Sequence, residues 1–204
     1  MNVSDAIARR RSVRAYLDQP VDVAVVKDII ERAARTASGG NLQPWHVDIV
    51  HGDTLAGIKA TLRDRMAKGI PPEKPEYAVY PPGLTAPWED RRRAVGEAMF
   101  SAIGIPREDK AKRMQWFVRN FQFFDAPVAL FVSLDRQMGL PQWSDAGALL
   151  NSIMLLLVEA GPEDRSRWIH LPLGLQLALR DPAIEWRLPT APEPAPQAGA
   201  SDTD

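Results

Sequence analysis

Residues 10–14 read Arg-Arg-Ser-Val-Arg, and residues 38–45 read Ser-Gly-Gly-Asn-Leu-Gln-Pro-Trp before an apolar run that ends at Val50. The first stretch places three guanidiniums and a hydroxyl within five residues. Arginine binds phosphate through paired hydrogen bonds and stays charged at any workable pH. In the second stretch Gly39 and Gly40 have no Cβ, so backbone amides can approach a flat ring closely. Together the two stretches indicate one site for a phosphorylated, planar ligand.

Each stretch also has a simpler interpretation when it is taken alone. A run of arginines is often a solvated face, and the same holds for the second run at residues 91–93. A Ser-Gly-Gly-Asn segment by itself is typical of a turn. The order and spacing of the two stretches favour the ligand site over these alternatives.

The chain resembles the nitroreductase family of FMN-dependent oxidoreductases. The run RRSVRAY after a short first helix, followed by a second helix and then by SGGNLQPWHVDIV, is similar to that family's opening signature. The similarity continues through YPPGL, VGEAMFSAIGIPREDK, NFQFFDAPVALFVSLDRQMG and PQWSDAG, and so covers residues 1 to about 156. The resemblance implies an α+β fold: a nitroreductase-like α/β/α sandwich with a mixed or antiparallel sheet and a long apolar central helix.

The resemblance also implies which residues of the arginine run bind the cofactor. Arg10, Arg11, Ser12 and Arg14 should line FMN, with Arg10 and Ser12 near its phosphate and ribityl chain. Arg14 should reach the pyrimidine edge of the ring, where positive charge stabilises the anionic reduced flavin.

A second set of residues should reach the flavin from the partner subunit, because the family's flavin lies at a dimer interface. These residues are Ser38, Gly39 and Asn41. Gln142 is a further candidate, whose alternative is a loop residue before a helix cap. A homodimer is therefore expected.

The activity that the resemblance implies is hydride transfer from NADH or NADPH, through FMN, to a nitroaromatic, a quinone or a similar small-molecule acceptor. The flavin carries the hydride and the protein supplies position and electrostatics, so we expect no catalytic side chain. The choice of acceptor should depend on loops such as residues 70–88. The histidines have no metal-ligand spacing, so we expect no metal site.

Composition agrees with this interpretation without establishing it. A chain of 204 residues can form one domain with a sizeable core, and its net charge of −1 gives no basic field for nucleic acid. There is no cysteine, which excludes disulfides and thiolate metal sites. We expect no membrane span and no signal peptide, and hence a soluble, cytoplasmic protein.

Local patterns predict the secondary structure. Ser4 or Asp5 should cap the first helix, Asp22 the second, and Ser144 or Asp145 the long apolar helix. Strands are expected over residues 45–50 and, fully buried, over 127–134. Helices are expected over 89–101 and 107–124, and an amphipathic helix is marked by Leu55, Ile58, Leu62 and Met66. Residues 70–87 are rich in proline and should form a loop.

The resemblance to nitroreductases stops at about residue 156. The segment LLLVEAG that begins at Leu155 resembles the glucose-methanol-choline oxidoreductases, in which the glutamate of such a segment holds the ribose of FAD. Glu159 occupies that place. No G-x-G-x-x-G fingerprint precedes it, so a polar residue at a helix end is the better interpretation.

These observations predict the domain organisation: an incomplete FMN-binding domain at 1–156, a foreign segment at 157–190 and a disordered tail at 191–204. Without a late strand, the sheet should keep an open edge. The chain would then be a fusion or a joined product. The alternative function is a truncated or fused nitroreductase remnant that binds flavin weakly or not at all. An FAD-dependent alcohol oxidase, inferred from the tail alone, ranks last.

Overall fold

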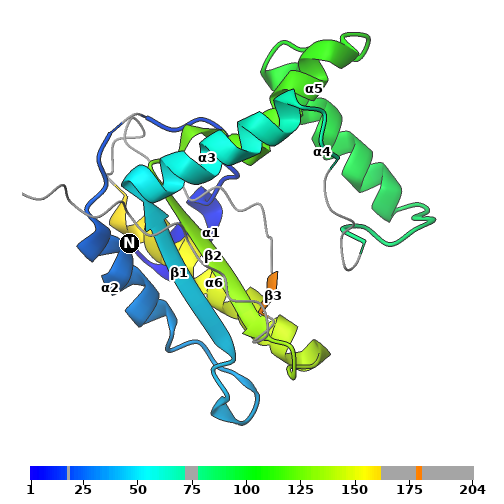
Figure 1. Ribbon diagram of the computed structural model, residues 1–204. Helices are drawn as coiled ribbons and strands as arrows, with labels where there is room; N and C mark the ends of the chain where they lie inside the picture. The colour runs from blue at the N-terminus through cyan, green and yellow to red at the C-terminus, as the bar shows by residue number, and fades with distance from the viewer. Residues whose placement is uncertain (18, 72–77, 162–177, 181–204) are drawn as a thin grey trace, which may run out of the picture.

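The computed structural model describes residues 1–17, 19–71, 78–161 and 178–180, the last segment through its backbone only. Its body is a sheet with helices on both faces (Figure 1). Helices α2 (Val23–Ala33) and α6 (Leu140–Ala160) pack on one face, and α3 (Gly52–Ala67) packs on the other. The expected nitroreductase-like α/β/α sandwich is confirmed.

The sheet is mixed, with strand order β1-β2-β3. Strand β1 (Trp45–His51) runs antiparallel to β2 (Val128–Asp135), pairing Trp45 with Leu134 and His51 with Val128. Both long strands lie within a residue or two of the expected ranges. Strand β3 (Ala178–Arg180) adds in parallel to the last residues of β2. The edge of β2 that was expected to stay open is therefore paired over this short length.

Alternation along the strands decides which helices each face meets. On one face Trp45, Val47 and Leu130 pack against α2 and α6. On the other face Val50 and Ala129 pack against α3. The centre of the larger core is the contact between α2 and α6, which buries Ile29, Ala33, Leu149, Ile153 and Leu157.

Asp22 caps α2 as expected: its Oδ1 accepts a hydrogen bond of 2.8 Å from the amide of Ala24. The expected cap of the first helix is wrong by a few residues. Helix α1 (Val3–Arg9) begins after Asn2, whose Oδ1 accepts from the amide of Asp5 at 2.8 Å. Asp5 is the third residue of this helix and completes a capping box.

The expected start of α6 is also wrong, because the helix begins one turn before Ser144 and Asp145. Pro141 lies in the first turn, where its missing N–H costs nothing and its fixed φ suits a helix. The Oε1 of Gln142 accepts from the amide of Gly139 at 3.0 Å. This bond satisfies the amide of the residue just before the helix, as the N3 side chain does in a capping box.

Helix α6 is long and apolar enough, by length and composition, to cross a membrane. Its apolar residues Leu149, Ile153 and Leu157 are buried against α2. These side chains of α6 therefore belong to the core of the sandwich.

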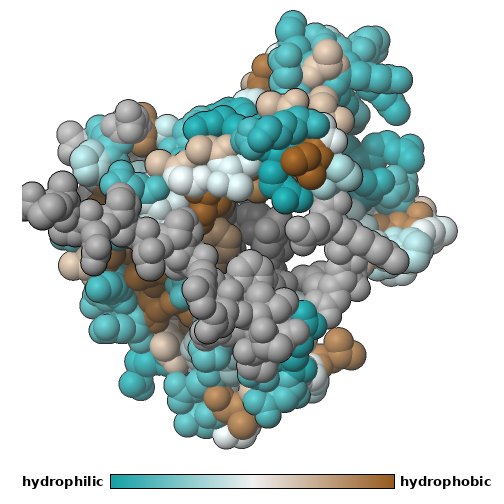
Figure 2. Space-filling model, in the orientation of Figure 1, coloured by the Kyte–Doolittle hydropathy of each residue, from teal (hydrophilic) through white to brown (hydrophobic). Residues whose placement is uncertain are grey.

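Helices α4 (Trp88–Ala102) and α5 (Lys110–Val118) form an arm that projects from the body beyond the end of α3 (Figure 1). Most of the arm surface is hydrophilic in the view of Figure 2. Arg113 of α5 joins the two helices: its guanidinium bonds both carboxylate oxygens of Glu97 at 2.9 and 2.8 Å and lies 4.2 Å from the Phe100 ring centroid.

The expected helix over 107–124 is shorter than predicted. Helix α5 ends at Val118, and a 3₁₀ segment, η2 (Arg119–Asp125), leads into β2. Phe123, Phe124 and Asp125 have positive φ angles of 54°, 50° and 68°, which no α-helix accommodates. The expected domain boundary near residue 156 falls inside the unbroken α6, and residues 162–177 and 181–204 lie outside the described part.

Candidate functional site

The arginine run follows the end of α1. Arg10 is the C-cap residue, and its amide donates to the carbonyl of Ala6 at 3.0 Å. The guanidinium of Arg11 folds back and donates from Nη1 to the carbonyls of Ala8 at 2.6 Å and Arg10 at 3.0 Å. Arg11 thus satisfies carbonyls that the helix end leaves free. The guanidinium of Arg10 makes no hydrogen bond or ion pair with the described residues.

The next residues are shaped by contacts to their own backbone. Arg14 Nη1 donates to the carbonyl of Ser12 at 3.3 Å, and the Tyr16 hydroxyl donates to the carbonyl of Val13 at 3.2 Å. Burial raises the pKa of Tyr16 above its usual range, while the positive charge of Arg14 acts in the opposite direction. Tyr16 is therefore a neutral hydroxyl, and the polar groups near it are the half-buried guanidinium of Arg14 and the exposed hydroxyl of Ser12.

The second candidate stretch forms a loop around the short 3₁₀ segment η1 (Gly39–Asn41). Ser38 Oγ accepts from the amide of Gln43 at 3.0 Å, and Gln43 Nε2 donates to Asn41 Oδ1 at 3.1 Å. Gly40 and Asn41 have positive φ angles of 59° and 56°. Glycine and asparagine are the residues that tolerate this conformation, so the Gly-Asn pair fixes the path of the loop.

This loop is attached to α6. The amide of Gly39 donates to Oδ2 of Asp145 at 3.2 Å. A Cβ built on Gly39 would lie 3.9 Å from the same oxygen, an ordinary contact distance. Asp145 was expected only as a helix cap. No local pattern could have shown its contact with Gly39, because 106 positions separate the two residues.

The two candidate stretches lie apart within one chain. In Figure 1 the loop between α2 and β1 lies beyond the start of β1. The segment after α1 crosses the opposite end of the sheet, near the start of α3. One chain alone therefore does not bring Arg10, Ser12 and Arg14 together with Ser38, Gly39 and Asn41.

Two other residues from the sequence analysis have structural partners. Gln142, a candidate flavin ligand, uses its side-chain oxygen to cap α6. Glu159 lies in the last turn of α6, as the simpler interpretation predicted, and its Oε2 is 2.6 Å from Nη2 of Arg32 on α2.

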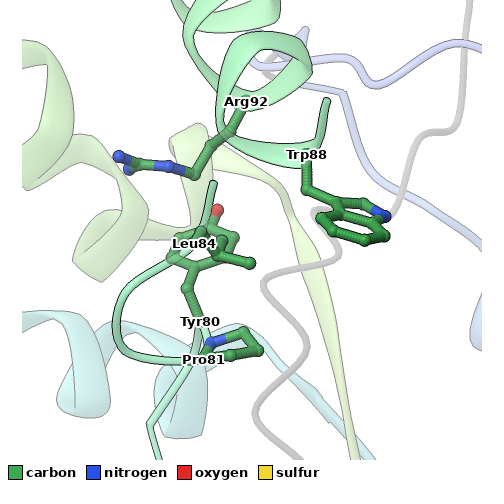
Figure 3. Close-up of a pocket in the computed structure, with 5 residues that line it drawn as sticks. All are labelled: Tyr80, Pro81, Leu84, Trp88 and Arg92. Carbon is green, nitrogen blue, oxygen red and sulfur yellow. The ribbon is translucent and has the colours of Figure 1, made fainter. Parts of the chain in front are cut away.

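The structure also contains an open, apolar pocket at the start of α4, which no local sequence pattern indicated. It has a volume of about 530 Å³ and is lined by Tyr80, Pro81, Leu84, Trp88 and Arg92. Figure 3 shows the Trp88 indole on one side and the Tyr80 ring on the other, with the side chain of Arg92 reaching over Tyr80. The Arg92 guanidinium carbon is 5.3 Å from the centroid of the Tyr80 ring.

The fold and these motifs agree with comparisons to known proteins. The Nitroreductase family matches residues 7–162. The chain therefore belongs to the nitroreductase family and is an oxidoreductase of the nitroreductase type.

Individual relatives give the same result. The chain is 36% identical over 159 residues to the nitrobenzene nitroreductase of Ectopseudomonas oleovorans. The aligned stretch covers 75% of this chain and 67% of that protein. It is 37% identical to a 4-nitrobenzoate reductase of Nocardioides sp. over 74% of this chain and 62% of that protein. The chain thus spans about two thirds of the length of these curated relatives.

Among solved structures, the FMN and NADPH-dependent nitroreductase NfnB from Sphingopyxis sp. strain HMH superposes with a TM-score of 0.76. The two chains are 49% identical, and the match covers 79% of this chain and 72% of that one.

Proposed function

We propose that this chain is an FMN-dependent NAD(P)H oxidoreductase that reduces nitroaromatic compounds. The observation that carries the proposal is the 49% identity, within the same fold, to an FMN and NADPH-dependent nitroreductase. The loop and the arginine run that would hold the cofactor both lie within the matched residues 7–162.

The residues present fit a phosphorylated, planar cofactor. The guanidinium of Arg10 has no competing partner among the described residues, and Ser12 presents an exposed hydroxyl. Both are groups that bind phosphate. At Gly40 a Cβ would meet nothing within 4 Å, so the backbone of the loop is open to a ring. When bound, FMN would supply the hydride-accepting and hydride-donating chemistry.

The protein's part in that reaction is to bind and orient. We assign Arg10 and Ser12 to the phosphate and ribityl chain, and Arg14 to the pyrimidine edge, where its charge would favour the reduced anion. Arg11 and Gln142 stay in the proposed set, although both side chains also cap helices.

Ser38, Gly39 and Asn41 would approach the ring from a second copy of the chain. The separation of the two stretches in one chain supports this arrangement, because a single site could then include both only across a dimer interface (Figure 1). We therefore propose a homodimer with two shared sites.

The acceptor is proposed from the relatives. Those proteins are named for nitrobenzene and 4-nitrobenzoate, so a nitroarene is the proposed substrate class, with quinones and similar compounds as further acceptors. NADPH is the proposed donor, with NADH as the alternative. We place the protein in the cytoplasm, where these nucleotides are available.

The visible spectrum of the purified protein tests the proposal directly. Flavin absorption bands that bleach when NADPH is added and return when a nitroarene is added are the expected result. A titration with FMN measures the affinity. A colourless protein that binds FMN only at millimolar concentration would overturn the proposal and favour a remnant with little affinity for flavin.

A further inference from the structure

The pocket at the start of α4 includes Arg92, the middle residue of the arginine run at residues 91–93. Trp88 opens α4, and Arg91 and Arg92 follow it by three and four positions. Residues with this spacing lie side by side on one helix face. Trp88 therefore shares its face of α4 with Arg91 and Arg92, while Arg93 lies on a different side of the helix.

The three arginines of the run differ in how far the carboxylate of Glu89 neutralises their charge. Arg92 is neutralised, since its Nε and Nη2 bond the two carboxylate oxygens of Glu89 at 2.8 Å each. Arg93 shares the same carboxylate more loosely, with 3.6 Å between its Nη2 and Oε1 of Glu89. Arg91 makes no ion pair with the described residues. It is the one arginine of the run whose charge Glu89 leaves uncompensated.

The pocket wall suits a flat heteroaromatic ring. Tyr80 and Trp88 are 57% and 59% exposed, so their faces are accessible. The guanidinium of Arg92 lies over the Tyr80 ring, 5.3 Å from its centroid, in a cation–π contact that favours this position of the ring. Aromatic faces bind nucleobases by stacking, whatever the base. An aromatic pocket beside one uncompensated guanidinium is thus suited to a base linked to a phosphate.

We propose that this pocket binds the adenosine 2′-phosphate end of NADPH, with the adenine against Tyr80 and Trp88 and the 2′-phosphate at Arg91. This inference rests on the proposed function, which makes NADPH the hydride donor. An arginine beside the ribose is a known means of accepting the 2′-phosphate that distinguishes NADPH from NADH. The start of α4, where the pocket lies, is away from the loop before β1 and from the segment after α1 in Figure 1, which suits the end of the dinucleotide that does not react.

The first experiment measures binding of 2′,5′-ADP to the full chain by calorimetry. This probe carries the adenine and the 2′-phosphate but no nicotinamide, so its binding does not depend on flavin chemistry. Arg91→Ala should weaken binding about tenfold, the effect of removing one charge-assisted hydrogen bond. Arg93→Ala, which removes the same charge from the other side of α4, should change the Kd less than about twofold.

Trp88→Leu tests the stacking, and Trp88→Phe keeps an aromatic face if the leucine variant folds poorly. The leucine variant should weaken 2′,5′-ADP binding and the phenylalanine variant should largely restore it. Wild-type protein that binds 5′-ADP as tightly as 2′,5′-ADP, or that binds neither below millimolar concentration, would overturn the inference. Equal losses in Arg91→Ala and Arg93→Ala would do the same, because they would indicate a diffuse charge effect.

Steady-state kinetics of the FMN-loaded protein give a second test. Arg91→Ala should raise the KM for NADPH about tenfold and leave the KM for NADH and for 4-nitrobenzoate unchanged. A raised KM for 4-nitrobenzoate with an unchanged KM for NADPH would overturn the inference and identify Arg91 as an anchor for the acceptor's carboxylate. If the protein binds no FMN yet binds 2′,5′-ADP through Arg91, the proposed function fails and the nucleotide pocket stands.

Discussion

The backbone amide of Gly39 donates a hydrogen bond of 3.2 Å to the carboxylate of Asp145, and so holds the loop of η1 against α6. Helix α6 is anchored in turn by its buried contact with α2. The loop that is proposed to approach the flavin is therefore fixed to the most deeply packed helix of the described fold. A binding loop held by a rigid element loses less freedom when its ligand binds.

Removing this contact should weaken FMN binding without unfolding the protein. We expect Asp145→Ala to raise the Kd for FMN about fivefold, because the loop loses a charge-assisted hydrogen bond. Asp145→Asn keeps an acceptor oxygen and should have a smaller effect. Asp64→Ala, which breaks a surface pair between α3 and its C-cap residue Lys68, is the matched control and should leave the Kd unchanged. A Kd in Asp145→Ala equal to that of the control would show that the loop is held by other means.

The contact between α2 and α6 should dominate stability. Leu149 is fully buried in this core, whereas Leu140 on the same helix is 85% exposed. Leu149→Ala should lower the free energy of unfolding by about 2–5 kcal/mol, and Leu140→Ala should change it by less than about 0.5 kcal/mol. Urea denaturation followed by circular dichroism measures both. Similar losses in the two variants would contradict the packing described for α6.

Glu159 should matter little for flavin binding. Its ion pair with Arg32 is largely exposed, with side-chain accessibilities of 41% and 48%, and such pairs contribute little to stability. Glu159→Ala should therefore leave the Kd for FMN unchanged and lower the melting temperature slightly, less so in high salt. A large loss of flavin in this variant would instead support the cofactor-binding role that the resemblance of the tail assigned to it.

The order of the arm should depend on acid pH. The hydrogen bond from Arg113 lowers the pKa of Glu97 below its usual value. A lowered folded-state pKa means that the pair stabilises the arm above the unfolded-state pKa and stops doing so as the pH falls through the folded-state pKa. Hydrogen-exchange protection of α4 and α5 should fall over that acid range in the wild type. In Glu97→Gln the protection of α4 and α5 should already be low at neutral pH. The amides of α2, which lie outside the arm, serve as the internal reference.

The sequence predicted the elements whose signals are local. Asp22 next to an apolar periodic run identified the start of α2, and alternation with β-branched residues identified β1 within a residue. The start of α6 was misjudged because Ser144 and Asp145 are common caps, whereas the actual signal was Pro141 with Gln142. The left-handed turn at Phe123–Asp125 has no sequence signal, since none of its residues is glycine.

The sequence predicted the parts of the candidate site that lie in consecutive positions, and it did not predict the parts that depend on contacts between distant segments. The residue types of the arginine run and of the Ser-Gly-Gly-Asn loop were readable because each lies in a few consecutive positions. The hydrogen bond from Gly39 to Asp145 and the pocket between Tyr80 and Trp88 depend on how distant segments pack. Side-chain capping by Arg11 and Gln142 was not expected, because a ligand site and a helix cap use the same groups.

The last prediction tests the proposed site and the proposed dimer together through Arg14 and Asn41. Arg14→Ala should weaken FMN binding about tenfold, since a charged hydrogen bond is removed from a half-buried position. It should also lower the reduction potential of the bound flavin, because the reduced anion loses a counter-charge. Asn41→Ala should cost less, since Asn41 Oδ1 is already shared with the side chain of Gln43.

The decisive measurement uses a mixed dimer, in which one chain carries Arg14→Ala and the other carries Asn41→Ala, purified with two different affinity tags. If each site takes Arg14 from one chain and Asn41 from the other, one site of the mixed dimer is intact and the other has lost both residues. An FMN titration should then show two affinities, one of them equal to that of the wild type. Two weakened sites, neither with wild-type affinity, would mean that both residues contact flavin within one chain. Two sites of wild-type affinity would mean that the arginine run is a solvated surface and that the cofactor is held elsewhere.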